Sequence, residues 1–107
     1  MNARWIYITC KDTQEAQQIG RALVEERLVA CVNILPGMQS LYWWEGKVVS
    51  DQETVMIAKT DAKKVAALTD RVKELHSYEV PCVIALPIQE GNPDYLQWIS
   101  DSLSPIS

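Results

Sequence analysis

Hydrophobic residues between positions 4 and 10 alternate with a period of two, which predicts a β-strand. An apolar stripe at helical spacing follows this strand. Asp12 stands three residues before Glu15, which is the spacing of a helix-capping box. Together these features predict an amphipathic helix over roughly residues 12–28.

The middle of the chain has the pattern of a long β-hairpin. Residues 28–35 and 40–44 are rich in β-branched and aromatic side chains, and the Pro-Gly pair at 36–37 predicts a turn or bulge between them. A turn at Gly46 leads into a return strand over residues 47–59. The hairpin is longer than a small two-layer domain needs.

The last third of the chain predicts a helix, a strand and a second, shorter helix. The first helix begins after Thr60-Asp61, and its apolar stripe consists of Val65, Leu68, Val72 and Leu75. Pro81 limits this helix, and residues 80–88 predict the final strand. Asn92-Pro93 has the pattern of an N-cap followed by proline at the first helical position, which predicts a closing helix.

The predicted order is therefore βαββαβ with a terminal helix. A duplicated split β-α-β unit gives a ferredoxin-like α+β sandwich, in which two helices cover one face of a four-stranded antiparallel sheet. Right-handed crossovers place the strands in the order 4-1-3-2. Residues 1–107 form one domain, because either half would be too small for a stable core.

The charge balance and the cysteine count restrict the partners and the compartment. Ten lysines and arginines oppose fourteen aspartates and glutamates, a net charge of −4, so a basic surface for nucleic acid is not expected. The longest uncharged stretch, residues 28–44, is interrupted by Asn33 and Pro36 and does not resemble a membrane span. Three cysteines cannot close a complete disulfide set, and no signal-peptide pattern is seen at the N-terminus. We therefore expect the reducing cytoplasm.

The apolar residues outside the predicted core favour a homo-oligomer. Two helices cover only one face of the sheet, which leaves Trp5 and Tyr7 on the other face. A half-exposed sheet with a few surface aromatics is common. However, both sides of the first strand are apolar, and a projecting hairpin would expose strand edges to other chains. We therefore expect further copies of the chain to cover this surface, with Tyr42, Trp43 and Trp44 as interface anchors.

The same topology brings four polar residues to one rim of the sheet. Cys10 ends the first strand, His76 ends the second helix, and Glu79 and Cys82 lie at the start of the last strand. Thiolate and imidazole groups suit Cu(I), Cu(II) and Zn(II), so Cys10, His76 and Cys82 are candidate metal ligands. The alternatives are that the cysteines are ordinary core residues and that His76 is exposed and uncommitted. Cys31 begins the second strand at the opposite end, outside this group.

Catalysis has little support in the sequence. The four glycines are scattered and form no phosphate-binding loop, and one histidine with unaligned thiols does not indicate a catalytic triad. Lys59 ends a strand in an apolar run, where it would pair with a carboxylate or meet an anion near the second helix. We therefore expect a protein that is not an enzyme.

Several segments carry a family resemblance when they are taken together. They are Ala30–Gly37, Ser40–Lys47, Ile57–Thr60 and His76–Pro81. With these segments the chain resembles the CutA family of divalent-cation tolerance proteins. The resemblance extends from Tyr7 to Leu103.

The resemblance implies a ferredoxin-like subunit in a tight homotrimer, similar to that of PII signalling proteins, with the long hairpin pairing across subunits. It also implies a cytoplasmic role linked to copper and other divalent metals such as zinc. Metal-binding members use a cysteine and a histidine that correspond to Cys10 and His76. The chain departs from the family pattern at Leu75, Ser77 and Cys82, so the usual ligand set is incomplete and Cys82 would substitute as a softer donor.

Two functions follow from these observations. The first is a trimeric, metal-binding protein that contributes to copper or divalent-cation tolerance. The alternative is a trimeric PII-like signalling or scaffold module that binds a small anionic ligand or a partner protein between subunits. The candidate cleft and interface residues are Tyr42, Trp43, Trp44, Lys59, Tyr78 and Glu79.

Overall fold

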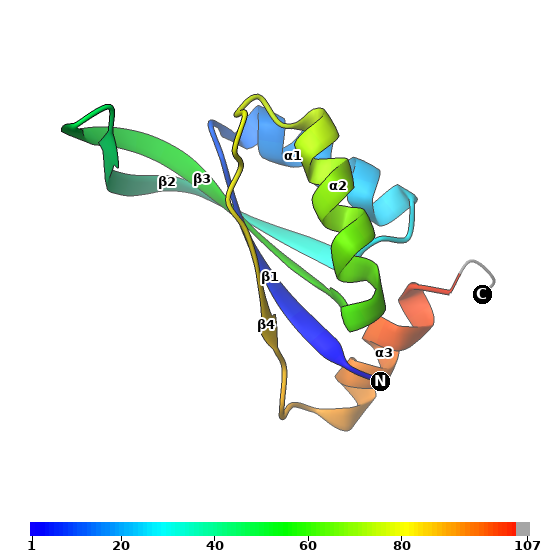
Figure 1. Ribbon diagram of the computed structural model, residues 1–107. Coiled ribbons are helices and arrows are strands. Elements are labelled where there is room, and N and C mark those ends of the chain that lie inside the picture. The colour runs from blue at the N-terminus through cyan, green and yellow to red at the C-terminus, as the bar shows by residue number, and fades with distance from the viewer. Residues whose placement is uncertain (105–107) are drawn as a thin grey trace.

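The computed structural model describes residues 1–104 and forms two layers, a sheet and two helices packed on one of its faces, with a third helix at one end of the sheet (Figure 1). The elements are β1 (Ala3–Cys10), α1 (Thr13–Glu25), β2 (Cys31–Trp44), β3 (Lys47–Asp61), a 3-10 turn (Ala62–Lys64), α2 (Val65–Leu75), β4 (Val83–Pro87) and α3 (Pro93–Ser102). The sheet is antiparallel with the order β2-β3-β1-β4. The predicted βαββαβ order, terminal helix and strand order are confirmed.

The main core lies between the sheet and helices α1 and α2. The alternation of β1 sends Ile6, Ile8 and Cys10 into this core, where they meet side chains of both helices, as predicted. Helix α1 approaches the sheet closely at Gly20, where a Cβ atom would lie 2.9 Å from Val32 Cγ2. A larger residue at this position would therefore push α1 away from β2.

Helix α3 packs on the end of the sheet where β2 begins and forms a smaller, separate core there. Ile99 and Leu103 are buried there against Ala30. Asn92 caps α3 by accepting a hydrogen bond from the Asp94 N–H, as the Asn-Pro pattern predicts. The Arg27 guanidinium donates to the Ser102 carbonyl and ties α3 to the end of α1.

The long hairpin is continuous, and of the turn or bulge expected at Pro36-Gly37 the structure has the bulge. Strand β2 runs through Pro36-Gly37 with a register shift between Leu35 and Met38, and Gly37 adopts a φ of 81°. Such a bulge inserts an extra residue without ending the strand. Beyond Thr54, which pairs with the last residue of β1, the two strands of the hairpin pair only with each other and project from the body of the protein (Figure 1).

Three element boundaries differ from the sequence predictions for local reasons. Helix α1 ends at Glu25 rather than near residue 28, because Arg27 adopts a φ of 60°. Strand β3 continues to Asp61, so Asp61 caps the 3-10 turn instead of starting α2 directly. Strand β4 begins at residue 83 rather than 80, and Pro81, within the missing part, has no N–H to donate to the neighbouring strand.

The outer face of the sheet is apolar where the helices do not cover it. Trp5 pairs with Leu86 and Tyr7 with Ile84, and about half of each of these two aliphatic side chains is exposed. None of the helices among residues 1–104 has the length and hydropathy needed to cross a membrane.

Candidate metal centre

Three potential metal ligands meet where β1 ends and the two core helices converge. Cys10 is the last residue of β1, Glu15 lies in the first turn of α1, and His76 follows the last residue of α2. Their ligand atoms all lie within 4.8 Å of one another, and all three residues are buried. We call this group the Cys10–Glu15–His76 cluster.

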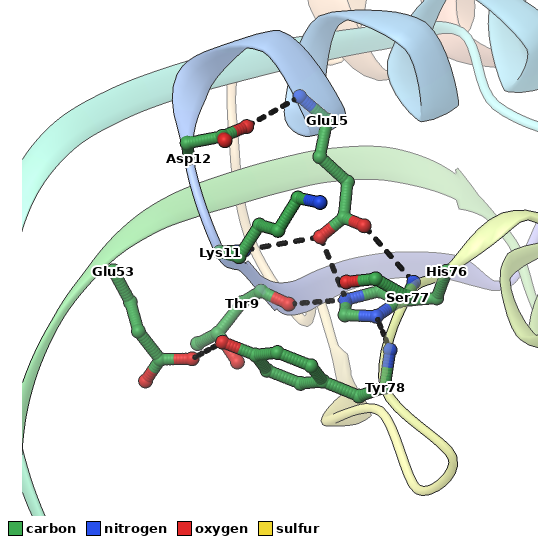
Figure 2. A network of polar contacts seen from close by, with 8 residues as sticks. All are labelled: Thr9, Lys11, Asp12, Glu15, Glu53, His76, Ser77 and Tyr78. Atoms are coloured by element: carbon green, nitrogen blue, oxygen red, sulfur yellow. Dashed lines mark hydrogen bonds and ion pairs between the residues drawn. The ribbon is translucent and has the colours of Figure 1, made fainter.

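Glu15 joins the start of α1 to the segment after α2. Its Oε1 accepts a hydrogen bond from the Lys11 N–H at 3.0 Å, and its Oε2 accepts one from the Ser77 N–H at 2.9 Å (Figure 2). The Asp12 carboxylate accepts from the Glu15 N–H, as the capping-box spacing predicts. The carboxylate of Glu15, however, binds Lys11 and Ser77 instead of returning to the Asp12 backbone.

The pKa of the Glu15 carboxyl is lowered from its ordinary value of 4.5. Burial by itself raises this pKa, but the hydrogen bonds from Ser77 and Lys11 and the proximity of His76 outweigh burial and favour the carboxylate. The cluster therefore contains a carboxylate that stays ionised at a lower pH than an ordinary glutamate does.

Both ring nitrogens of His76 are occupied by backbone groups. Nε2 lies 2.8 Å from the Thr9 carbonyl oxygen, and Nδ1 accepts the Tyr78 N–H at 3.0 Å (Figure 2). The hydrogen-bond pattern therefore assigns the proton to Nε2, which donates to Thr9. Glu15 Oε1 is 3.7 Å from the same nitrogen. The alternative of an exposed, uncommitted histidine is wrong, because the His76 side chain is fully buried.

Cys10 is a protonated thiol at neutral pH. Burial raises its pKa to about 12, and the negative charges of Glu15, Asp12 and Glu53 act in the same direction. A metal ion that binds this sulfur must therefore displace a proton.

Cys82 lies at the same rim as Cys10 but on the opposite face of the sheet. Ile8 pairs with Val83 in the antiparallel register, so the next position aligns Thr9 with Cys82. The Thr9 side chain interacts with the Cys82 thiol, and burial and the nearby Glu53 raise the pKa of that thiol. Alternation along β1 therefore separates the two predicted cysteine ligands, and the carboxylate of Glu15 takes the third position beside Cys10.

The other predicted residues lie outside the cluster. Trp43 and Trp44 are exposed near the hairpin tip, and the Tyr42 hydroxyl donates to Asp51 on the facing strand. Glu79 is exposed in the segment after α2. Two more residues sit in the sheet or beside it: the Lys59 amine donates to Asn33, and the Tyr78 hydroxyl donates to Glu53.

Cys31 lies at the far end of β2, as the topology predicts. Its sulfur is 3.6 Å from the Tyr95 hydroxyl of α3.

Sequence reasoning missed two residues at this rim. Glu15 was identified only as a helix-capping residue, and its capping-box spacing was the available signal that its carboxylate points toward the end of β1. Glu53 had no such signal, because its role depends on contact with Tyr78 at a separation of 25 residues.

The cluster fits a soft or borderline cation in donor chemistry and spacing. Thiolate, imidazole and carboxylate are ligands for zinc and copper, and three ligand atoms within 4.8 Å can reach one ion. Among residues 1–104, every buried side-chain nitrogen or oxygen already has a hydrogen-bond partner. A cation would therefore have to replace existing hydrogen bonds, including one that occupies a nitrogen of His76.

The lowered pKa of Glu15 predicts acid destabilisation. The Glu15 carboxylate contributes its full stabilisation when the pH is above the pKa of the unfolded chain, near 4.5. This contribution is lost as the pH falls through the lower pKa of the folded protein. Urea unfolding measured between about pH 6 and pH 3 should show a smaller pH dependence for Glu15→Gln than for the wild type. Parallel pH profiles for the two proteins would show that Glu15 is not responsible.

The sheet topology and the cluster define the class of the protein as a ferredoxin-like α+β domain with a candidate metal centre. Residues 4–102 match the family model of the CutA1 divalent ion tolerance protein. The chain belongs to this family, and the resemblance seen in the sequence is confirmed.

Relatives with known names agree with this assignment. The divalent-cation tolerance protein CutA of Thermus thermophilus is 50% identical over 97 residues, which cover 91% of this chain and 94% of that protein. Protein CutA of Mus musculus is 46% identical over 101 residues, or 94% of this chain. The match spans only 57% of the length of the mouse protein.

Solved structures of the family have the same fold. CutA1 from Oryza sativa superposes with a TM-score of 0.95 at 43% identity, covering 98% of this chain and 96% of that one. The periplasmic divalent cation tolerance protein CutA from Archaeoglobus fulgidus gives a TM-score of 0.92 at 43% identity, with coverage of 95% and 99%. The mixed α+β fold with its antiparallel sheet and three helices is thus shared with these proteins.

Proposed function

We propose that this protein acts in divalent-cation tolerance as a homotrimer that binds copper, or another soft or borderline cation such as zinc, without catalysing a reaction. The observation that supports the cation-binding part is the meeting of a thiol, an imidazole and a carboxylate within 4.8 Å at the end of β1. Family membership supports the link to divalent-cation tolerance.

Each residue of the cluster has a distinct part in this proposal. Cys10 supplies sulfur after losing its proton, and the imidazole of His76 supplies a nitrogen once one of its backbone hydrogen bonds is released. Glu15 supplies an oxygen and a negative charge that compensates the cation. Because the thiol must be deprotonated, binding should release a proton and weaken as the pH falls.

Cation binding is tested by calorimetric titration of the wild type with Cu(II) and Zn(II) and by repeating it in buffers of different ionisation enthalpy. Cys10→Ser and His76→Ala are expected to lose about 100-fold or more in affinity, since even outer-shell substitutions cost 10- to 100-fold at metal sites. Proton release should disappear in Cys10→Ser.

Two other cysteines provide matched controls for the titration. Cys31 lies at the end of β2 that is remote from the cluster, and Cys82 lies on the face of the sheet opposite to Cys10. The variants Cys31→Ser and Cys82→Ser should therefore bind the cation like the wild type. Unchanged affinity in Cys10→Ser and His76→Ala would contradict the proposed site. A loss in Cys82→Ser alone would move the site to the outer face.

The trimeric state is supported by apolar surface that one chain does not cover. Leu41, Trp43 and Val48 lie on one side of the projecting hairpin and are 73%, 74% and 60% exposed. Ile84 and Leu86 form a second exposed apolar patch, on the outer face of the sheet. Patches of this kind mark association surfaces, and a closed ring of identical copies would cover them and the hairpin edges together.

A cytoplasmic, non-catalytic role is part of the same proposal. All three cysteines are unpaired, which agrees with a reducing compartment. The three residues of the cluster are buried, which keeps a substrate away from their donor groups and agrees with a non-catalytic role.

A further inference from the structure

The segment between α2 and β4, residues 76–82, connects the buried cluster with the long hairpin. At its start, the His76 ring belongs to the cluster and the Ser77 N–H donates to Glu15. The ring of Tyr78 then lies against the His76 ring, with 4.7 Å between the centroids. The Tyr78 hydroxyl extends to β3 and donates to Glu53 Oε2 at 3.1 Å (Figure 2).

Tyr78 therefore links the cluster to β3 through its backbone and its side chain. Its backbone N–H occupies Nδ1 of His76, and its side chain is fixed to β3 at the point where the hairpin leaves the sheet. Burial and the Glu53 carboxylate raise the pKa of the Tyr78 phenol, so the hydroxyl keeps its proton and remains a donor.

We propose that Tyr78 is a positioning residue for the cluster and that its hydrogen bond to Glu53 keeps segment 76–82 closed over Cys10. Opening of this segment withdraws the Tyr78 N–H from His76 Nδ1 and uncovers the Cys10 thiol. The consequence for cation uptake rests on the proposed function: opening then precedes binding, and the hairpin controls the rate at which the cluster becomes available.

Closure can be measured without any metal, from the rate at which a thiol reagent modifies Cys10. N-ethylmaleimide labelling, resolved by peptide mass spectrometry, reports Cys10, Cys31 and Cys82 separately in each sample. Tyr78→Phe keeps the ring and the backbone N–H but loses the hydroxyl, and it should label Cys10 about tenfold faster. That change corresponds to about 1.4 kcal/mol in the opening equilibrium.

Variants of the partner residue separate the hydrogen bond from other effects. Glu53→Ala should match Tyr78→Phe, whereas Glu53→Gln keeps an acceptor oxygen and should restore slow labelling. Tyr42→Phe is the matched control, because it removes a tyrosine-to-carboxylate hydrogen bond elsewhere on the same hairpin and should leave Cys10 unaffected. Cys31, at the far end of β2, should keep its wild-type rate in every variant.

The denaturant dependence distinguishes local opening from global unfolding. Labelling through opening of a short segment exposes little surface, so its rate should change little with low concentrations of urea. The proposal is overturned if Tyr78→Phe labels Cys10 at the wild-type rate, or if the faster labelling has the steep urea dependence of global unfolding.

Cation association by stopped flow then separates this inference from the proposed function. Faster Zn(II) association in Tyr78→Phe supports both the closure by Tyr78 and the cluster as the binding site. Faster Cys10 labelling without any Zn(II) association that depends on Cys10 supports the closure and overturns the proposed cation site.

Discussion

Replacement of Glu15 by alanine is expected to lower the free energy of unfolding by about 3 kcal/mol. The carboxylate accepts hydrogen bonds from the Lys11 and Ser77 backbone amides, and these come from segments more than sixty residues apart in the chain. Without the carboxylate, both N–H groups lose a part-buried hydrogen bond, and each such loss costs about 1–3 kcal/mol. Urea unfolding at neutral pH measures the change.

Glu25→Ala is the matched control for this experiment. It removes the same side chain from the same helix at an exposed position, so its effect should stay within about 0.5 kcal/mol. A loss below about 1 kcal/mol in Glu15→Ala would mean that water replaces the carboxylate and that Glu15 does not join α1 to the segment after α2.

Replacement of Trp43 by glutamate is expected to dissociate the proposed trimer. Three chains of 12.1 kDa should give an assembly of about 36 kDa by light scattering. Trp43 is exposed in the single chain, and a tryptophan at the centre of an interface contributes about 2 kcal/mol or more. Three equivalent interfaces lose this contribution together, and each also gains a buried charge. The variant should therefore elute as a monomer at micromolar concentration.

Gln18→Glu provides the same charge change on a surface that is not expected to associate. Gln18 is exposed on α1, in the helix layer rather than on the hairpin, and this variant should keep the wild-type mass. A wild-type protein that scatters as a stable 12 kDa monomer would contradict the trimeric state. A Trp43→Glu variant that keeps the mass of a trimeric wild type would show that Trp43 does not anchor the interface.

The sequence predicted the element order, the strand order and the core side of β1. These follow from local patterns, because side-chain periodicity distinguishes strand from helix and right-handed crossovers leave one arrangement of the strands. It also predicted that Cys10 and His76 lie at the same end of the sheet. The structure brings these two residues together in one buried cluster.

The third member of the cluster was not predicted, for a specific reason. Cys82 and Cys10 lie on opposite faces of the sheet because Val83 pairs with Ile8. This register aligns Cys82 with Thr9, whose side chain points away from the face that Cys10 occupies. A shift of one residue would reverse the face of every side chain on β4, and the pattern of the strand alone does not fix that register. The sequence therefore placed Cys82 at the right end of the sheet without placing its face.

The alternation of apolar residues and the helix caps at Asp12 and Asn92 belong to the sequence itself, because they depend on neighbours within a few positions. Contacts between distant segments were decided only by the tertiary structure. The Glu15 carboxylate meets Ser77, and His76 meets the Thr9 carbonyl, across 62 and 67 residues. Such contacts depend on how whole helices and strands pack against one another. Packing between segments that are far apart in the sequence is set by the complete core rather than by any local pattern.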